Sequence, residues 1–141
     1  MVEQRERVFG QGQVLFRQGE KGGDLFFLRS GEVELSVRDS TTGEPAVVAV
    51  VAPPSVLGTM TFLEGDARSA TGKALTAVKA LVVGQEQREE LLNTVPDWFK
   101  VLVKDLTSNL RRLNVEYARL KTENEDLKKR LKILESRKHH F

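Results

Sequence analysis

The last third of the chain carries a heptad repeat that only a long helix can satisfy. From Asp97 to Phe141 the sequence contains neither glycine nor proline, and leucines recur every seven residues from Leu106 to Leu134. A helix of about 40 residues is about 60 Å long, roughly twice the diameter of a small domain. Most of such a helix cannot pack on its own domain, so its apolar stripe requires another partner.

The apolar stripe has the spacing of a coiled coil. Position d of the repeat is leucine from Leu106 onward, and position a includes Tyr117 and Asn124. This spacing keeps one stripe facing a partner helix as two helices supercoil. The alternative is one amphipathic helix packed on its own domain. We predict a dimer seam formed by Leu106, Leu110, Leu113, Tyr117, Leu120, Asn124, Leu127, Leu131 and Leu134.

Charges beside the stripe favour a parallel pair of helices. In a parallel dimer, each residue at position g meets the position e residue that lies five places later in the other chain. The pairs formed in this way have opposite charges, and they are Glu116 with Lys121, Glu123 with Lys128, and Arg130 with Glu135. An antiparallel pair centred on Asn124 would bring like charges together instead. Because a buried asparagine at position a favours two strands in register, the sequence predicts a parallel homodimer.

Before about residue 85 the sequence has the period of β-strands. Val33, Leu35 and Val37 alternate with polar residues, and the runs 25–28 and 47–51 are short and apolar. Glycine-containing turns separate these segments. Many short strands at even spacing predict a small barrel or jelly roll.

Two helices are expected after the strands. A short helix over 86–93 precedes Pro96, which suits the first position of the long helix. Trp98 and Phe99, at the start of the long helix, are expected in a core. The predicted fold class is mainly β with α: a jelly-roll β-barrel with a hinge helix over 1–95, then a coiled-coil helix over 96–141.

The composition excludes most catalytic chemistry. The chain has no cysteine and only two histidines, His139 and His140, so disulfides, thiolate zinc sites and cysteine nucleophiles are excluded. We therefore expect no catalytic centre, no metal site and no cofactor. The charged N-terminus and the lack of an apolar run of about 18 residues predict a cytoplasmic protein without a membrane segment.

Charge is distributed unevenly along the chain. Residues 1–96 carry 10 Lys and Arg against 13 Asp and Glu, whereas residues 97–141 carry 12 against 7. A zipper that follows a basic helix would suggest DNA binding, but the segment 97–106 is apolar and nearly neutral. Too few residues follow Leu134 for a helix-turn-helix, and the basic end 136–141 is expected to be a solvated tail. We expect no direct sequence-specific DNA binding.

Two segments of the predicted barrel carry a distinctive pattern of glycines and polar residues. Residues 14–35 read VLFRQGEKGGDLFFLRSGEVEL, and residues 57–71 read LGTMTFLEGDARSAT. The first resembles the opening strands of cyclic-nucleotide-binding domains, and the second resembles their phosphate-binding cassette, with matching length from Gly58 to Arg68. The resemblance covers residues 9 to about 115 and implies a jelly roll that binds a cyclic nucleotide, with cAMP as the first candidate.

The cassette also suits an anion on chemical grounds. A short helix beginning near Gly58 would present free backbone N–H groups, and Arg68 and Ser69, at the start of the next strand, would add charge-assisted and hydroxyl hydrogen bonds. By resemblance, Arg68 would pair with an equatorial phosphate oxygen, Ser69 would hold the other, and Ala70 would line the sugar. The candidate ligand-binding residues of the barrel are Gly58, Thr59, Met60, Arg68, Ser69 and Ala70.

Departures from the family pattern leave the ligand open. Thr59 stands where the family has a glutamate that accepts the ribose 2′-hydroxyl, and Ala67 replaces the usual proline. Losing one charge-assisted hydrogen bond costs about 1.5–3 kcal/mol, which is about ten- to hundredfold in affinity. The alternative role of Arg68 is a surface ion pair with Glu64 or Asp66.

The resemblance places contacts with the base on the long helix. Aligning Arg111, Arg112 and Leu113 with an Arg-Arg-Leu sequence of bacterial members puts Glu116 and Tyr117 near the base, one of them from the partner chain. Packing in the dimer seam is the alternative for Tyr117. A solvated position is the alternative for Glu116.

The chain as a whole is predicted to be a sensor and not an enzyme. It is expected to bind a cyclic nucleotide in the barrel, to dimerise through the coiled coil, and to signal to an unidentified protein effector by re-packing the hinge helix. One alternative is a ligand-free dimeric adaptor with a degenerate nucleotide pocket. Another is a transcription factor separated from its DNA-binding domain.

Overall fold

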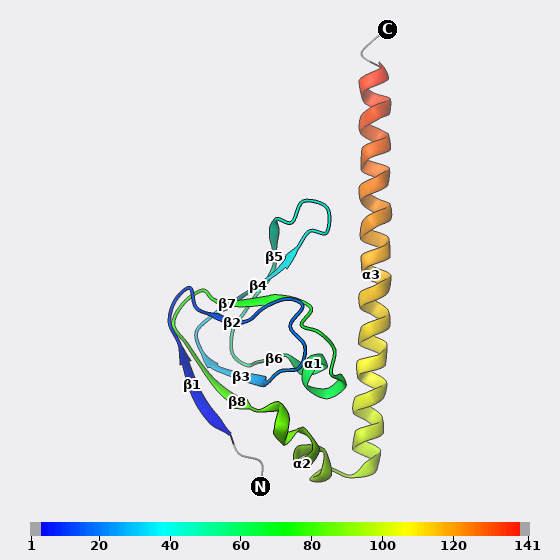
Figure 1. The fold of residues 1–141 in the computed structure, drawn as a ribbon. Coiled ribbons are helices and arrows are strands. Elements are labelled where there is room, and N and C mark those ends of the chain that lie inside the picture. Colours follow the sequence, from blue (N-terminus) through cyan, green and yellow to red (C-terminus); the bar gives the residue numbers. More distant parts are fainter. Residues whose placement is uncertain (1–3, 139–141) are drawn as a thin grey trace. The chain divides into compact units, whose positions relative to one another are not determined.

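The computed structural model describes residues 4–138, and the chain divides into two compact units, Met1–Val95 and Pro96–Phe141 (Figure 1). The predictions for His139 and His140, and for the end of the basic tail, lie outside the described residues. The strands of the first unit are β1 (Arg5–Phe9), β2 (Val14–Phe16), β3 (Leu25–Ser30), β4 (Val33–Arg38), β5 (Pro45–Val51), β6 (Ser55–Leu57), β7 (Thr71–Ala74) and β8 (Val78–Val83).

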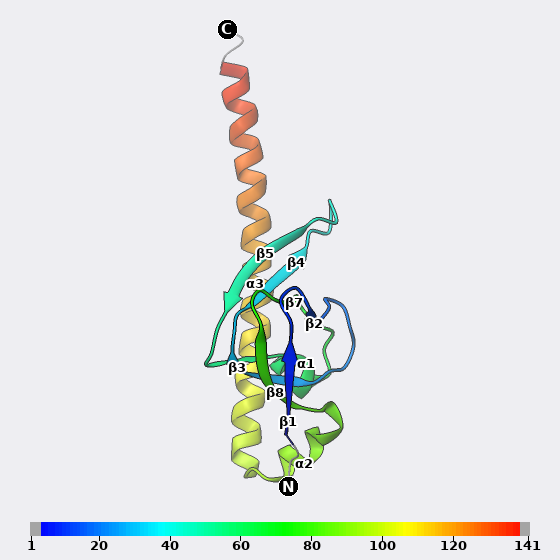
Figure 2. The same cartoon turned by 90° about the vertical axis from the view of Figure 1, so that its left-hand side faces the viewer.

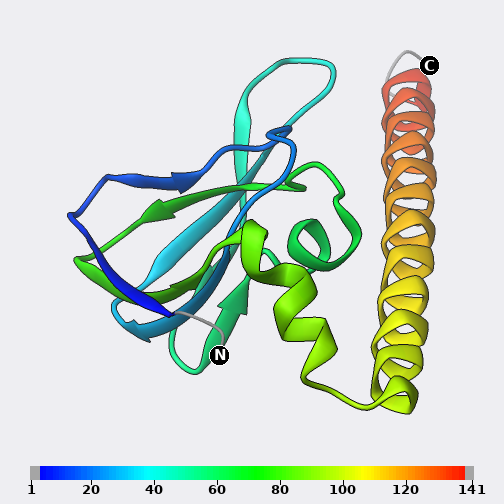
Figure 3. The same cartoon turned by 60° about the horizontal axis from the view of Figure 1, so that its bottom comes forward.

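These strands form two antiparallel sheets that face each other (Figure 3). One sheet has the order β1-β8-β3-β6 and the other has the order β2-β7-β4-β5. Among the described strands, only β4 and β5 pair as a hairpin of consecutive strands, and the loop end of this hairpin projects beyond the other strands (Figure 2). The chain thus crosses repeatedly between the sheets, and the predicted jelly roll followed by a long helix is confirmed.

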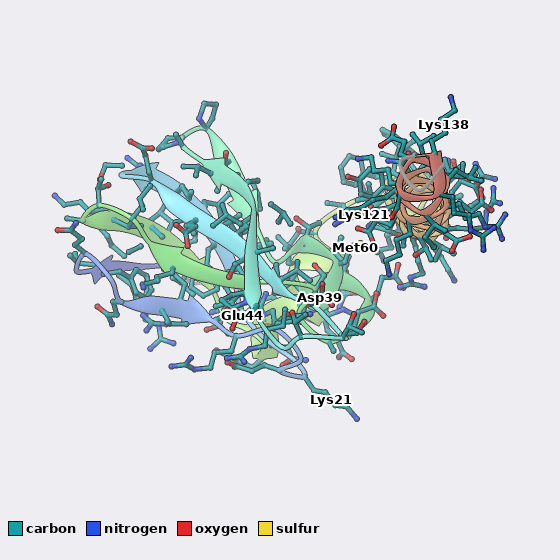
Figure 4. All side chains as sticks on the ribbon, turned by 90° about the horizontal axis from the view of Figure 1, so that it is seen from above. Lys21, Asp39, Glu44, Met60, Lys121 and Lys138 are labelled. Atoms are coloured by element: carbon teal, nitrogen blue, oxygen red, sulfur yellow. The ribbon has the colours of Figure 1, made fainter. Side chains whose placement is uncertain are left out.

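A short backbone contact closes the β4–β5 hairpin. The N–H of Asp39 donates to the carbonyl of Glu44 at 3.0 Å, and both residues lie at the end of the hairpin (Figure 4). The Asp39 carboxylate also accepts the N–H of Thr41 at 2.7 Å. The connection between the two strands is therefore a compact, hydrogen-bonded turn.

Aromatic side chains fill the space between the sheets. The ring of Phe26 lies 5.7 Å from that of Phe16 and 6.2 Å from that of Phe9, measured between centroids. Strand alternation turns these rings inward from three different strands. The buried cluster consists of Phe9, Phe16, Phe26, Leu28, Val33, Leu57, Ala74, Val78, Ala80 and Val82.

Helical segments follow β6 and β8. They are α1 (Thr59–Glu64), the 3₁₀ helix η1 (Gln85–Gln87), α2 (Arg88–Asn93) and α3 (Asp97–Lys138). The hinge helix expected over 86–93 corresponds to η1 and α2 together. A second buried cluster of Leu25, Phe62 and Val83 holds α1 against the barrel, and Leu91 of α2 packs on it. Both helices lie at the same end of the barrel (Figure 3).

The start of α3 differs from the prediction. Pro96 precedes the helix, and its carbonyl accepts the N–H groups of Phe99 and Lys100 at 3.0 and 3.3 Å, so the first helical residue is Asp97. Trp98 was predicted to be a core residue, but its side chain is 67% exposed and contacts Phe99 edge-on. The prediction is wrong for both residues, because Phe99 is also exposed, at 39%, and the first turn of α3 buries neither side chain.

The 42-residue helix α3 exposes its apolar stripe along its whole length. The leucines and Tyr117 of the predicted seam are between 48% and 69% exposed in the single chain. Charged side chains project from several sides of the helix, as Lys121 and Lys138 do in Figure 4. Among residues 4–138, no helix is both long and apolar enough to cross a membrane.

Candidate functional site

The predicted cassette surrounds one buried arginine. Arg68 is 5% exposed, and its guanidinium lies 4.7 Å from the centroid of the Phe16 ring and 5.8 Å from that of Phe26. Because both rings belong to the core, the guanidinium points into the barrel. The alternative of a surface ion pair with Glu64 or Asp66 is therefore wrong, since the Arg68 side chain is not at the surface.

Protein groups accept hydrogen bonds from only part of the Arg68 guanidinium. Nη2 of Arg68 donates to the carbonyl oxygen of Asp24 at 2.8 Å, whereas the buried Nη1 has no hydrogen-bond partner among the described residues. Burial lowers the pKa of Arg68, and the charges of Asp24 and Glu20 oppose this effect. A buried donor without an acceptor is costly. An anion that accepted a hydrogen bond from Nη1 would remove that cost.

Two glycines form the walls beside the guanidinium. Gly58, with φ +86°, lies so close that a Cβ atom added there would overlap Nη1. Gly23, with φ +147°, lies equally close to Nη2. Positive φ and the close approach both require glycine at these positions. The cradle is therefore lined by backbone on the two sides of the arginine.

Hydrogen bonds between two loops fix the backbone of Arg68. Its N–H donates to the carbonyl of Glu20 at 2.8 Å, and its carbonyl accepts the N–H of Gly19 at 2.8 Å. Strand β7 begins only at Thr71. The prediction that Arg68 and Ser69 start a strand is therefore wrong, because residue 68 pairs with the loop before β3.

The other predicted residues of the barrel lie on the two segments that flank Arg68. Thr59 is the exposed first residue of α1, and Met60 follows it, half-buried (Figure 4). The first N–H groups of a helix have no partner within the helix. Ser69 is exposed and Ala70 is half-buried, directly after the arginine. The structure thus brings residues 58–60 and 68–70 to one place, and their contacts with a ligand remain predictions.

The two predicted base contacts lie in the other unit, on α3. Glu116 forms an ion pair with Arg119 of the same helix, and Tyr117 is 69% exposed. The hydrogen bond that Arg119 donates to the Glu116 carboxylate, together with the charge of Glu123, raises the pKa of Arg119. The role of Glu116 and Tyr117 toward a base stays a prediction.

Sequence reasoning missed three residues around Arg68. None of Gly23, Asp24 and Gln85 was predicted as a site residue. Asp24 holds Arg68 through its backbone carbonyl, which any residue could supply. Its side chain accepts the N–H of Gln85, a contact between residues so far apart in sequence that no local pattern indicates it. The adjacent pair Gly22-Gly23 was the one local hint of a close approach.

Comparison with known proteins agrees with this geometry. A family model described as "Cyclic nucleotide-binding domain" matches residues 6–95. The "Cyclic AMP receptor protein" of Thermus thermophilus is 29% identical over 112 residues, covering 79% of this chain and 51% of that protein. A "CRP-like cAMP-activated global transcriptional regulator" of Mycobacterium tuberculosis is 24% identical over 112 residues, covering 79% and 50%. The chain therefore spans about half the length of these relatives.

Solved structures show the same fold. The N-terminal domain of a transcriptional regulator from Streptomyces coelicolor superimposes with a TM-score of 0.64 and 31% identity, covering 79% of this chain and 77% of that one. The Thermus thermophilus catabolite activator protein superimposes with a TM-score of 0.68 and 27% identity, covering 83% and 55%. Family model, relatives and fold agree that the chain belongs to the cyclic nucleotide-binding domain family.

Proposed function

We propose that this chain is a cytoplasmic sensor module that binds a cyclic nucleotide, with cAMP as the first candidate. The observation that supports this most is the buried Nη1 of Arg68, which lacks an acceptor among the described residues. A cyclic phosphodiester carries one negative charge and two free oxygens, which suit a guanidinium beside the backbone N–H groups at the start of α1. Two relatives, a cyclic AMP receptor protein and a cAMP-activated transcriptional regulator, add support.

The output is proposed to be a protein contact. Two copies join through the heptad stripe of α3 into a parallel homodimer. Binding of the nucleotide alters the packing of α1, and with it that of the hinge segment η1 and α2. The resulting change is read by a protein effector and not by direct contact with DNA.

A ligand panel with thermal melting tests the proposal. At a hundredfold excess over its Kd, cAMP should stabilise the protein by about 2.7 kcal/mol, and linear AMP should do much less. Arg68→Ala should abolish this effect because it removes the buried cation. Arg68→Met should do the same while keeping a long side chain against Phe16. Arg29→Ala, which removes an exposed arginine of β3, is the matched control and should melt and bind as the unaltered protein does.

The same panel contains the outcome that contradicts a sensor. If millimolar cAMP, cGMP and other cyclic nucleotides all leave the melting curve unchanged, while Arg68→Met alters only the stability of the free protein, the pocket is degenerate. The dimeric adaptor then becomes the better description.

A further inference from the structure

The 3₁₀ helix η1 is hydrogen-bonded to the loop that lines the arginine site. The N–H of Gly23 donates to the side-chain oxygen Oε1 of Gln85 at 3.0 Å, and the N–H of Gln85 donates to Oδ1 of Asp24 at 3.2 Å. Gly22 packs so closely on the Gln85 amide that an added Cβ would lie 2.5 Å from Oε1. Gln85 therefore holds the segment 22–24 from one side.

Arg68 holds the same segment from the other side. Its Nη2 donates to the carbonyl of Asp24 at 2.8 Å, and Gly23 packs directly on Nη2. Three consecutive residues thus separate the guanidinium of Arg68 from the side chain of Gln85. A shift of this segment must move the hydrogen-bond acceptor of Arg68.

The next residues of the hinge contact the opposite wall of the site. Nε of Arg88, the first residue of α2, donates to the carbonyl of Leu63 in α1 at 2.9 Å. The helix α1 begins beside Gly58, which packs on Nη1 of Arg68. The hinge is therefore bonded both to the segment 22–24 and to the cassette helix.

We propose that Gln85 is a positioning residue of the anion site: it fixes the segment 22–24 and thereby the place of the Arg68 guanidinium. This inference rests on the proposed function. Gln85 belongs to the hinge segment. A ligand that holds Arg68 in place is therefore expected to restrict the motion of η1 as well. By thermodynamic reciprocity, if the ordered state of η1 binds the ligand more tightly by some factor, the bound ligand favours the ordered state of η1 by the same factor.

The test compares two glutamines of η1. Gln85→Ala and Gln85→Met both remove the acceptor of the Gly23 N–H, and Gln85→Met keeps the length of the side chain against Gly22. Either should weaken cAMP binding about three- to tenfold in calorimetry, the range of one lost hydrogen bond. Gln87→Ala is the matched control, since the side chain of Gln87 makes no hydrogen bond to the described residues, and it should bind as the unaltered protein does.

A second measurement needs no nucleotide. In the ligand-free protein, hydrogen exchange by NMR should be faster at the Gly23 amide and at Nε–H of Arg68 in both Gln85 variants and unchanged in Gln87→Ala. A purely structural role would instead lower the melting temperature and leave the affinity of the folded protein unaltered.

The outcomes separate this inference from the proposed function. Unchanged exchange at Arg68, unchanged affinity in the Gln85 variants, or an equal loss in Gln87→Ala would each overturn it. If the unaltered protein binds no cyclic nucleotide, the proposed function fails. The exchange rates in the ligand-free protein then still test whether Gln85 positions Arg68.

Discussion

At the scale of single residues, the site depends on an arginine enclosed by backbone. Arg68 lies on the Phe16 ring, donates to the Asp24 carbonyl, and is flanked by Gly58 and Gly23. Its neighbours leave room for the guanidinium only because two of them lack a Cβ atom. Substitutions at these glycines should therefore act on ligand binding through the arginine.

Gly58→Ala should abolish binding of cAMP, and Gly65→Ala should not. The two glycines flank α1 and have similar positive φ, +86° and +75°, so the backbone strain of about 1–2 kcal/mol is common to both. A Cβ at Gly58 overlaps Nη1 of Arg68, whereas a Cβ at Gly65 meets nothing within 4 Å. Calorimetric titration measures binding, and urea unfolding measures the shared strain. Equal loss of binding in both variants would mean that the arginine is not displaced.

Thr59→Glu should tighten cAMP binding about ten- to hundredfold. A carboxylate at this exposed first residue of α1 restores the acceptor for the ribose 2′-hydroxyl that the family pattern contains, a charge-assisted hydrogen bond of about 1.5–3 kcal/mol. Thr59→Gln, equal in size and uncharged, is the control and should gain less. Affinity that stays constant in both variants would show that the sugar does not reach residue 59.

At the scale of elements, α3 combines an exposed apolar stripe with ion pairs inside the helix. Arg119 pairs with Glu116 and, at 2.8 Å, with Glu123. These glutamates were predicted to meet lysines of a partner chain, so the internal pairs compete with that arrangement. Exposed ion pairs contribute little to stability, so we expect the predicted apolar seam with its single asparagine to have the larger influence on assembly.

Asn124→Leu should raise the melting temperature and broaden the distribution of oligomers toward trimers. The exposed asparagine lies on the seam of α3, and a polar residue there lowers stability while selecting two strands in register. Analytical ultracentrifugation and circular dichroism measure the two effects. Ser108→Leu, at the outer position of the helix, is the control and should leave the oligomer unchanged. A clean dimer for Asn124→Leu would show that other contacts set the register.

At the scale of the whole molecule, the second unit exposes an apolar stripe that is unfavourable for a single helix in water. Leucines from Leu106 to Leu134 are about half exposed or more. We expect the full chain to sediment at about 32 kDa, twice its mass of 15.8 kDa, at micromolar concentration. Replacing both Leu113 and Leu120 by glutamate should halve the measured mass. A monomer of the unaltered chain would contradict the dimer.

Charge over the whole chain should produce only weak attraction to DNA. The excess of Lys and Arg lies in residues 97–141, and the segment 97–106 that leads into the zipper is nearly neutral. Duplex binding measured by fluorescence anisotropy should therefore disappear by about 0.2 M salt, as expected for diffuse charge. Sequence-selective retention at that salt concentration would show a specific DNA interface.

Local patterns in the sequence were enough to predict the fold, and the cassette was predicted from one continuous segment. The alternation of Val33, Leu35 and Val37 and the heptads of α3 are repeats of two and seven residues, which any short window reveals. The segment from Gly58 to Arg68 is continuous in sequence, so its resemblance to a cassette could be seen directly. The strands β1, β6 and β8 lack so clear a period and were not individually predicted.

Tertiary structure alone decided the orientation and the contacts of the Arg68 side chain. The direction of Arg68 into the barrel depends on the ring of Phe16, the carbonyl of Asp24 and the loop carbonyl of Glu20. The link to the hinge depends on Gln85 meeting Gly23 from the far end of the first unit. These contacts join distant parts of the chain, and several of them use backbone groups that every residue has, namely the carbonyls of Asp24 and Glu20 and the N–H of Gly23. The sequence by itself therefore determined the jelly roll and the long helix, because their patterns repeat locally. Folding determined that Nη1 of Arg68 is buried without an acceptor among the described residues, because that depends on contacts between distant segments.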